Sequence, residues 1–391
     1  MDSAESTSRA SGDPASFACE AQGHRLHFYP GGRDRLTALL GLIDSARERL
    51  AVAFYIFATD ASSALVRDAL TRAAARGVEV RLIVDGFGAD ADEDFFAPLI
   101  AAGGYFCRFQ ARWSRRYLIR NHQKMVIADR RIAMLGGFNV EDDYFAGPGE
   151  DGWTDLAFTV EGPVVERIEA WFHGLDEWCL HREEQFNAIR RLVRRWDGGS
   201  GPVQLLIGGP TRGLSGWARR VSQDLAEGER LDMMMAYFSP PHGLIRRIRR
   251  IARRGRTRLI LAAKSDNAAT VGASRSHFAG LLRSGTDIRE YKARRLHTKL
   301  IVLDDAVYLG SANFDVRSLY LNLEIVLRIE DAALAERMRR MMDEYLPDTA
   351  RITPEIHAAR AGFWTRMRWR LCWFLVSVVD YSVSRKLNLG L

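Results

Sequence analysis

Two copies of one short motif bring together the residue types that phosphate chemistry requires. The spacing H-x-K-x-x-x-x-D occurs twice, and its members are His122, Lys124, Asp129, His297, Lys299 and Asp304. Imidazole can attack phosphorus or carry a proton, and ammonium groups stabilise charge on non-bridging oxygens. Because side chains alternate along a strand, each histidine and its lysine project from the same face. Each copy therefore predicts half of a phosphate site.

Two histidines allow two distinct tasks. One imidazole can attack phosphorus while the other protonates the leaving alcohol, and the second step reverses these roles with an incoming hydroxyl. Asp129 and Asp304 either support the motif loop or pair with a lysine. The scheme requires no metal and no cofactor, and apart from the motif pairs the sequence has no His, Cys and carboxylate cluster spaced for a metal.

Further polar residues recur at matching places after the two motifs. We expect Asn139, Ser311 and Asn313 to donate hydrogen bonds to phosphate oxygens. Asp155 and Glu324 each head an apolar strand, and we expect them to accept a ring N–H from the histidines. Such a carboxylate fixes the tautomer and orientation of an imidazole.

The elements around the motifs repeat in one order. Residues 49–60 are typical of a strand, a helix follows, and residues 78–84 form a second strand. The second half repeats this order, with its later strand at residues 259–263. The first helix is expected to bury Leu65, Ala69 and Ala73 and to end at Gly77. The second is expected to bury Leu244, Ile248, Ile251 and Ala252 and to end at Gly255.

This alternation indicates an α/β layered fold. The offset is 175 residues for the histidines and 174 for the asparagines, which predicts an internal duplication. We expect two tandem α/β/α sandwich units, residues 21–196 and 203–350, related by a pseudo-two-fold axis with the active site at their interface. Residues 197–202 read as a linker and residues 1–20 as a disordered tail.

Composition points to an anionic partner. The chain has 56 basic and 49 acidic residues, a net charge of +7 and a pI near 9.4. Such a balance suits a nucleic acid or an acidic membrane surface. The four cysteines are scattered without a C-x-x-C pair, so a reducing, cytosolic setting is the simplest interpretation. No apolar run reaches the roughly 20 residues that a spanning helix requires.

Three basic or aromatic segments are candidates for membrane contact. Residues 351–391 are predicted to be an amphipathic membrane-associated segment, although a helix packed on the catalytic domain is the alternative. Its key residues are Trp364, Arg366, Arg368, Trp369, Arg370, Trp373, Phe374, Arg385 and Lys386. Residues 246–258 contain eight arginines, which form either a membrane-facing surface or a solvated helix face. Residues 112–120 precede the first motif, and Arg115 or Arg116 could meet headgroups.

The paired motifs resemble those of the phospholipase D superfamily, and the likeness runs from about His24 to Pro347. Within that superfamily the chain is most similar to bacterial cardiolipin synthases. The segments that carry this likeness are "GGFNVEDDYF", "WTDLAFTVEGPVV", "GSANFDVRSLYLNLE" and, more weakly, "SRKLNLGL". Many members of that family begin with two membrane-spanning helices. Since this sequence shows none, it looks like the shorter, peripheral type.

The resemblance implies a covalent phosphatidyl-histidine intermediate, with His122 as nucleophile and His297 as acid and then base. It implies transfer of a phosphatidyl group from one phosphatidylglycerol to another with release of glycerol, and phosphatidylethanolamine stays open as a donor. The expected partner is an anionic phospholipid membrane, at the cytoplasmic face of the bacterial inner membrane, and no nucleic acid. Gly137 stands where the second motif has Ser311, so a phosphate-contacting hydroxyl is expected from one side only.

Two other functions are compatible with these residues. A phosphodiesterase of the same superfamily would hydrolyse a phospholipid or a nucleic acid, which the basic pI also favours. A noncatalytic membrane scaffold is the third interpretation, and the presence of both complete motifs argues against it.

Overall fold

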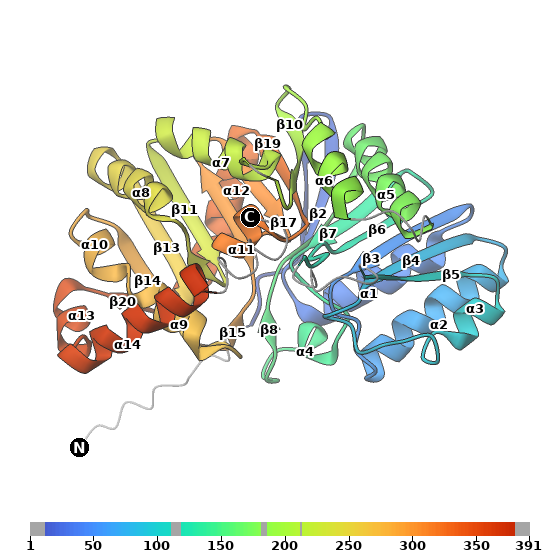
Figure 1. Cartoon of the computed structure of the whole chain (residues 1–391), viewed down its shortest axis with the longest axis horizontal. Helices are drawn as coiled ribbons and strands as arrows, with labels where there is room; N and C mark the ends of the chain where they lie inside the picture. The colour runs from blue at the N-terminus through green and yellow to red at the C-terminus, as the bar shows by residue number, and fades with distance from the viewer. Residues whose placement is uncertain (1–11, 111–118, 181–185, 212, 380–391) are drawn as a thin grey trace, which may run out of the picture.

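The computed structural model describes residues 12–110, 119–180, 186–211 and 213–379. These residues form two 8-stranded sheets, one in each half of the chain, which lie side by side in Figure 1. The predicted α/β fold of two tandem units is confirmed by these sheets.

In the first sheet, β3 and β4 form a parallel centre and antiparallel strands extend it on one side. Its order is β1 (Phe17–Ala21), β2 (His24–Tyr29), β9 (Ala157–Glu161), β7 (Ile132–Gly136), β6 (Met125–Ala128), β3 (Arg49–Phe54), β4 (Glu79–Asp85) and β5 (Tyr105–Phe109). One face is covered by α1 (Gly32–Ser45), α2 (Ala61–Ala75), α3 (Ala97–Ala101) and α4 (Asp142–Phe145).

The second sheet follows the same plan. Its order is β10 (Val203–Gly208), β19 (Glu324–Glu330), β17 (Ala306–Gly310), β16 (Lys299–Leu303), β11 (Arg230–Met235), β13 (Arg256–Ala262), β14 (Asp287–Tyr291) and β20 (Thr349–Ile352). Seven strands in each sheet correspond in order, and only the edge strands β1 and β20 have no counterpart. Its outer face is covered by α7 (Gly216–Glu227), α8 (His242–Arg254) and α10 (Phe278–Leu282).

The inner faces of both sheets share one apolar core. Two helices fill it: α5 (Val164–Leu180), with Trp171 fully buried, and α12 (Ala332–Glu344), with Met338 fully buried. Helix α5 also contacts β10, and α12 also contacts β1, so each helix touches the sheet of the other unit. Burial of this common apolar surface holds the two units against each other.

Local signals start and end the helices near the motifs. The Asp60 side chain accepts a hydrogen bond from Ser63 N and so caps α2. Beyond that helix, Gly77 has φ +90, a left-handed conformation that favours glycine. The predicted buried face of α2 is wrong at Leu65, which is 51% exposed, because Val66 and Leu70 pack inward beside the expected Ala69.

The N-terminal boundary also needs correction. Residues 17–20 were expected to be disordered, but they belong to β1, which pairs antiparallel with β2. Gln22 and Gly23 join these strands with φ of 50 and 73, as a two-residue hairpin turn requires. Phe17 stacks on Phe28, and this contact anchors the edge strand. Residues 1–11 lie outside the described part of the chain.

Residues 351 and 352 belong to the sheet through β20, so the expected C-terminal segment begins after them. Helices α13 (Pro354–Arg360) and α14 (Phe363–Phe374) follow, and a π-helical turn, η2 (Leu375–Val379), ends the described chain. Helix α14 packs on α9 (Ala268–Arg275), where a Cβ on Gly272 would lie 2.9 Å from Cys372 Sγ. Among the described residues, no helix combines the length and apolar character needed to cross a membrane.

Candidate active site

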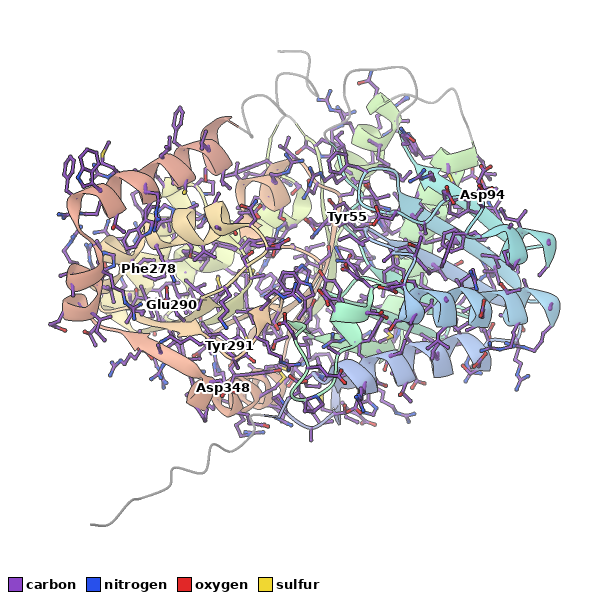
Figure 2. All side chains as sticks on the ribbon, turned by 90° about the horizontal axis from the view of Figure 1, so that it is seen from below. Tyr55, Asp94, Phe278, Glu290, Tyr291 and Asp348 are labelled. Atoms are coloured by element: carbon purple, nitrogen blue, oxygen red, sulfur yellow. The ribbon has the colours of Figure 1, made fainter. Side chains whose placement is uncertain are left out.

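Each motif histidine is anchored through its backbone to the opposite unit. Strand β8 (Trp153–Thr154) pairs with β15 (Arg295–Leu296), and His297 N donates to Thr154 O at 2.8 Å. On the other side His122 N donates to Leu323 O at 3.0 Å. The two histidines therefore face one pocket at the junction of the units, where Figure 2 labels Tyr55.

The orienting carboxylates are exchanged between the units. His122 Nδ1 lies 3.1 Å from Glu324 Oε2, and His297 Nδ1 lies 2.7 Å from Asp155 Oδ2. Both carboxylates are fully buried. With each Nδ1–H donated to a carboxylate, both Nε2 atoms are left for chemistry, as in an oriented catalytic histidine.

The two lysines lie beneath the histidines. Lys124 Nζ donates to His122 O at 2.7 Å, and Lys299 Nζ donates to His297 O. Lys299 Nζ also lies 2.7 Å from His297 Nδ1. Because that nitrogen donates its proton to Asp155, the contact places positive charge beside the ring without a second hydrogen bond on Nδ1.

Burial and the lysine charges favour neutral imidazoles at both motif histidines. Burial, followed by Lys124 and Lys299, holds the pKa of His122 well below its usual value. Burial and Lys299 lower the pKa of His297 to about 3. A bound anion would act in the opposite direction, because a nearby negative charge favours the protonated ring.

The two orienting carboxylates differ in acidity. Burial raises the pKa of Glu324 to about 7. Burial also acts to raise the pKa of Asp155, but Lys299 and His297 hold it below its usual value. Asp155 therefore stays ionised and can stabilise a protonated His297, whereas Glu324 beside His122 is only partly ionised near neutral pH.

Of the expected phosphate donors, two line the pocket and one supports an orienting carboxylate. Asn139 and Asn313 both line the pocket, and their contact with a phosphate stays a prediction. The Ser311 hydroxyl instead donates to Glu324, so it supports an orienting carboxylate. Asn139 Nδ2 donates to the Tyr144 hydroxyl at 2.8 Å, and that hydroxyl lies 3.3 Å from His297 Nε2.

Glycine at position 137 has a steric reason. A Cβ there would lie 2.5 Å from Asp155 Oδ1, so the carboxylate occupies the space that a side chain would fill. In the second unit the same place holds Ser311, whose hydroxyl bonds to the longer Glu324.

Asp129 and Asp304 are not brought into the pocket, which corrects their place in the expected catalytic set. The Asp129 carboxylate accepts backbone N–H bonds from Arg47, Glu48 and Arg49. Asp304 accepts the equivalent bonds from Glu229 and Arg230. Both aspartates lie beyond strands of the motif, about 16 Å along the chain from the lysines if extended, so their role is structural.

Aromatic residues that sequence reasoning missed line the pocket. The Tyr55 ring centroid lies 4.8 Å from that of His122, and the Trp153 centroid lies 5.2 Å from that of His297. Tyr237 lies 6.3 Å from His297 by the same measure. A usable signal existed, because Tyr55 and Tyr237 each follow the buried first strand of the repeat.

The pocket has a volume of about 530 Å³ and a mixed mouth. Arg120 and Arg317 contribute positive charge, and Leu375 and Val376 of η2 add an apolar side. Of the segment expected to border the pocket, residues 112–118 lie outside the described chain. Within the described residues there is no cluster of three His, Cys, Asp or Glu side chains arranged to hold a metal.

Two α/β units that bring a pair of carboxylate-bound histidines to one pocket, each with a buried lysine bonded to its backbone carbonyl, define a phospholipase D-like protein. The chain belongs to the family described as cardiolipin synthase, PLD-like domain, whose model matches residues 39–175 and 222–346.

Curated relatives support this assignment. Cardiolipin synthase A of Cronobacter sakazakii is 30% identical over 380 residues, which cover 90% of this chain and 75% of the relative. Cardiolipin synthase 1 of Bacillus cereus is 29% identical over 331 residues, and the match spans only 64% of that relative's length. Cardiolipin synthase B of Escherichia coli K12 is 27% identical, with 88% of this chain and 85% of the relative covered.

Solved structures support the fold. Phosphatidylserine synthase from Haemophilus influenzae aligns over 95% of this chain and 96% of its own, with a TM-score of 0.75 and 14% identity. Polyphosphate kinase from Porphyromonas gingivalis aligns over 86% of this chain and 49% of its own, with a TM-score of 0.58 and 15% identity.

Proposed function

We propose that the protein is a cardiolipin synthase, which transfers a phosphatidyl group from one phosphatidylglycerol to a second and releases glycerol. The observation that carries this proposal is the exchange of carboxylates between two histidines in one pocket. It supplies one nucleophile and one acid for a phosphodiester. The names of the curated relatives support a lipid substrate.

In the first step, His122 Nε2 attacks phosphorus. The bond from phosphorus to the headgroup oxygen breaks, and that oxygen takes a proton from His297 Nε2. Glycerol leaves, and the phosphatidyl group stays on His122. Lys124 and Lys299 stabilise the charge that develops on the non-bridging oxygens.

The second step reverses the proton transfer. A headgroup hydroxyl of the second phosphatidylglycerol gives its proton to His297 Nε2 and attacks phosphorus. The bond between phosphorus and His122 breaks, and the product carries two phosphatidyl groups on one glycerol. Both histidines return to their starting protonation states.

The carboxylates support this division of roles. Asp155 stays ionised and lies 2.7 Å from His297, so it stabilises the imidazolium that an acid needs. Glu324, with a pKa of about 7, lies 3.1 Å from His122 Nδ1 and accepts its N–H once ionised, which leaves Nε2 of a neutral ring free to attack. His122 is therefore the better neutral nucleophile, and the negative charge of the bound phosphodiester raises the pKa of His297 toward its working range.

Helix α14 supports a location at a bilayer surface. Trp364 is 81% exposed and Leu371 56% exposed, while Trp369 is buried against the domain. Tryptophan with flanking arginines suits the membrane interface. The helix runs into η2, where Leu375 lines the pocket mouth, so its apolar face leads to the site. Our proposal combines the two alternatives for this segment: one face of α14 packs on the domain, and the other face contacts the membrane. The cytoplasmic face of the inner membrane is part of this proposal, and it rests on the sequence alone.

Lipid products test the proposal. The protein is incubated with phosphatidylglycerol vesicles, and glycerol and the doubly phosphorylated lipid are measured. His122→Ala and His297→Ala should each abolish both products, while His173→Ala, on the exposed side of α5, should not. Phosphatidic acid as the sole lipid product would indicate a phospholipase, and nucleic-acid cleavage without lipid product would overturn the assignment.

A further inference from the structure

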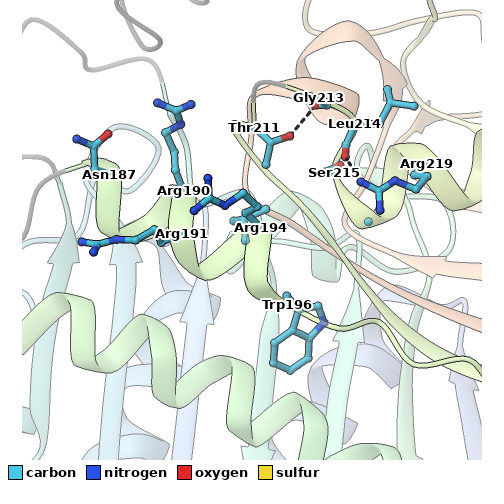
Figure 3. A pocket seen from close by; sticks show the side chains of 12 residues that line it. Asn187, Arg190, Arg191, Arg194, Trp196, Thr211, Gly213, Leu214, Ser215 and Arg219 are labelled. Carbon is cyan, nitrogen blue, oxygen red and sulfur yellow. Dashed lines mark hydrogen bonds between the residues drawn. The ribbon is translucent and has the colours of Figure 1, made fainter.

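A second hollow lies outside the catalytic pocket, between α6 (Phe186–Arg195) and the start of α7. It has a volume of about 570 Å³, and Figure 3 shows guanidinium groups from both helices around it. Its cationic side chains are Arg190, Arg191, Arg194 and Arg219. We call it the α6–α7 crevice. The catalytic scheme uses none of these residues.

The positive charge of the crevice comes from guanidinium groups on both of its helices. No Asp or Glu is among its described lining residues. Arg191 and Arg194 are three positions apart on α6, and like charges at this spacing destabilise a helix. An anion between them would relieve this repulsion and accept bidentate hydrogen bonds, which guanidinium groups offer to phosphate.

Other lining groups suit a phosphate on a membrane. Ser215 caps α7 by accepting from Ala218 N, so the positive end of a twelve-residue helix faces the crevice. The Trp196 indole lines the hollow and donates to Leu205 O at 2.9 Å. A tryptophan beside arginines is typical of the headgroup level of a bilayer.

The crevice also adjoins the catalytic pocket. The Ser215 hydroxyl donates to Leu319 O of α11 (Val316–Tyr320), whose Arg317 and Ser318 line the catalytic pocket. Below it, a Cβ on Gly209 would lie within 3.1 Å of both Val193 of α6 and Leu323. Leu323 O holds the backbone of His122, so α6 packs on the segment that positions the nucleophile.

From this charge, chemistry and position, we infer that the α6–α7 crevice binds the phosphate of an anionic phospholipid headgroup, separately from the lipid in the catalytic pocket. The inference rests on the proposed function only for its membrane setting. A lipid held there would place the bilayer surface against α6 and beside the catalytic mouth.

The test uses a lipid that cannot be a donor. Phosphatidic acid carries no headgroup alcohol to displace, so its binding does not depend on the transfer reaction. Co-sedimentation with phosphatidylcholine vesicles that contain phosphatidic acid compares three proteins. They are the wild type, the crevice variant Arg191→Ala/Arg194→Ala and the α8 control Arg250→Ala/Arg253→Ala. The control pair removes the same charge at the same spacing from the arginine face of α8.

We expect the crevice variant to bind about thirtyfold more weakly, since each basic residue near an anionic leaflet contributes a few-fold to affinity. The α8 control should lose much less, and Arg191→Lys/Arg194→Lys should recover most of the binding. Equal losses in the crevice variant and the α8 control would overturn the site, as would unchanged binding in the crevice variant with its fold intact by circular dichroism.

Two further arms separate the sources of phosphate. Inorganic phosphate or glycerol phosphate that displaces wild type from the vesicles at low concentration would show a site for a free phosphate compound, against our inference. A labelled oligonucleotide whose binding alone is lost in the crevice variant would also overturn it. Turnover of phosphatidylglycerol in detergent micelles is measured on wild type; its absence would refute the proposed transfer and leave the vesicle-binding result independent.

Discussion

Replacement of Asp155 by Asn tests the role of His297 as the acid. The substitution keeps the shape of the side chain but removes the charge that lies 2.7 Å from His297 Nδ1 and faces Lys299. Loss of one partner in a buried charged pair costs about 2–5 kcal/mol. At about 1.4 kcal/mol per factor of ten, a central value of about 3 kcal/mol lowers kcat/KM for phosphatidylglycerol more than a hundredfold.

A substrate with a good leaving group separates this acid from the nucleophile. Phosphatidyl-p-nitrophenol releases a weakly basic phenolate, which departs without a proton from His297. Asp155→Asn and His297→Ala should therefore release about one equivalent of nitrophenolate in a rapid burst and then stall, because the second step lacks its base. His122→Ala should give no burst.

Rapid mixing with absorbance detection measures the burst, and samples quenched in denaturant at neutral pH, where the P–N bond survives, reveal lipid covalently bound to protein. The matched variant is Glu324→Gln, which removes the partner of His122 and should lower the burst rate. A burst in His122→Ala and none in His297→Ala would show that the roles are reversed. Equal bursts in both variants would refute a histidine nucleophile.

Three more outcomes follow from the structure. The pH profile of kcat/KM should rise through about 7, because Glu324 ionises there and can accept the N–H of His122. It should fall above about 8, because Lys299 loses its charge. Glu324→Gln should remove only the rise on the acidic side, and a variant that keeps this rise would contradict the assignment to Glu324. Asp129→Ala should lower the free energy of unfolding by about 2 kcal/mol in urea titrations, because three backbone N–H groups lose their acceptor; an unchanged unfolding midpoint would exclude that role. The double variant Trp364→Ser/Leu371→Ser should bind phosphatidylglycerol vesicles more weakly than the wild type. The control Leu65→Ser, at a similarly exposed site on α2, should bind as the wild type does. Equal binding by the wild type and both variants would refute docking through α14.

Much of the architecture could be predicted from local patterns. Apolar strands, helices ended by glycine and the repeated motif spacing are short-range features, and they sufficed to predict two α/β units with paired histidines. The errors lie where burial depends on distant partners. Leu65 has helical spacing to Ala69, but α2 packs through Val66 instead. Residues 17–20 become ordered only because β2 offers an edge.

The residue types of the site were determined by the sequence, and their pairing was decided by the tertiary structure. Chemistry alone requires His, Lys and a carboxylate in each repeat, but it leaves open which carboxylate meets which histidine. The shared core of α5 and α12 brings the sheets together so that Asp155 meets His297 and Glu324 meets His122. The same packing leaves Asp129 and Asp304 at distant turns, since β6 and β16 carry the chain away from the pocket. These contacts join residues more than 140 positions apart, a separation that no local pattern encodes.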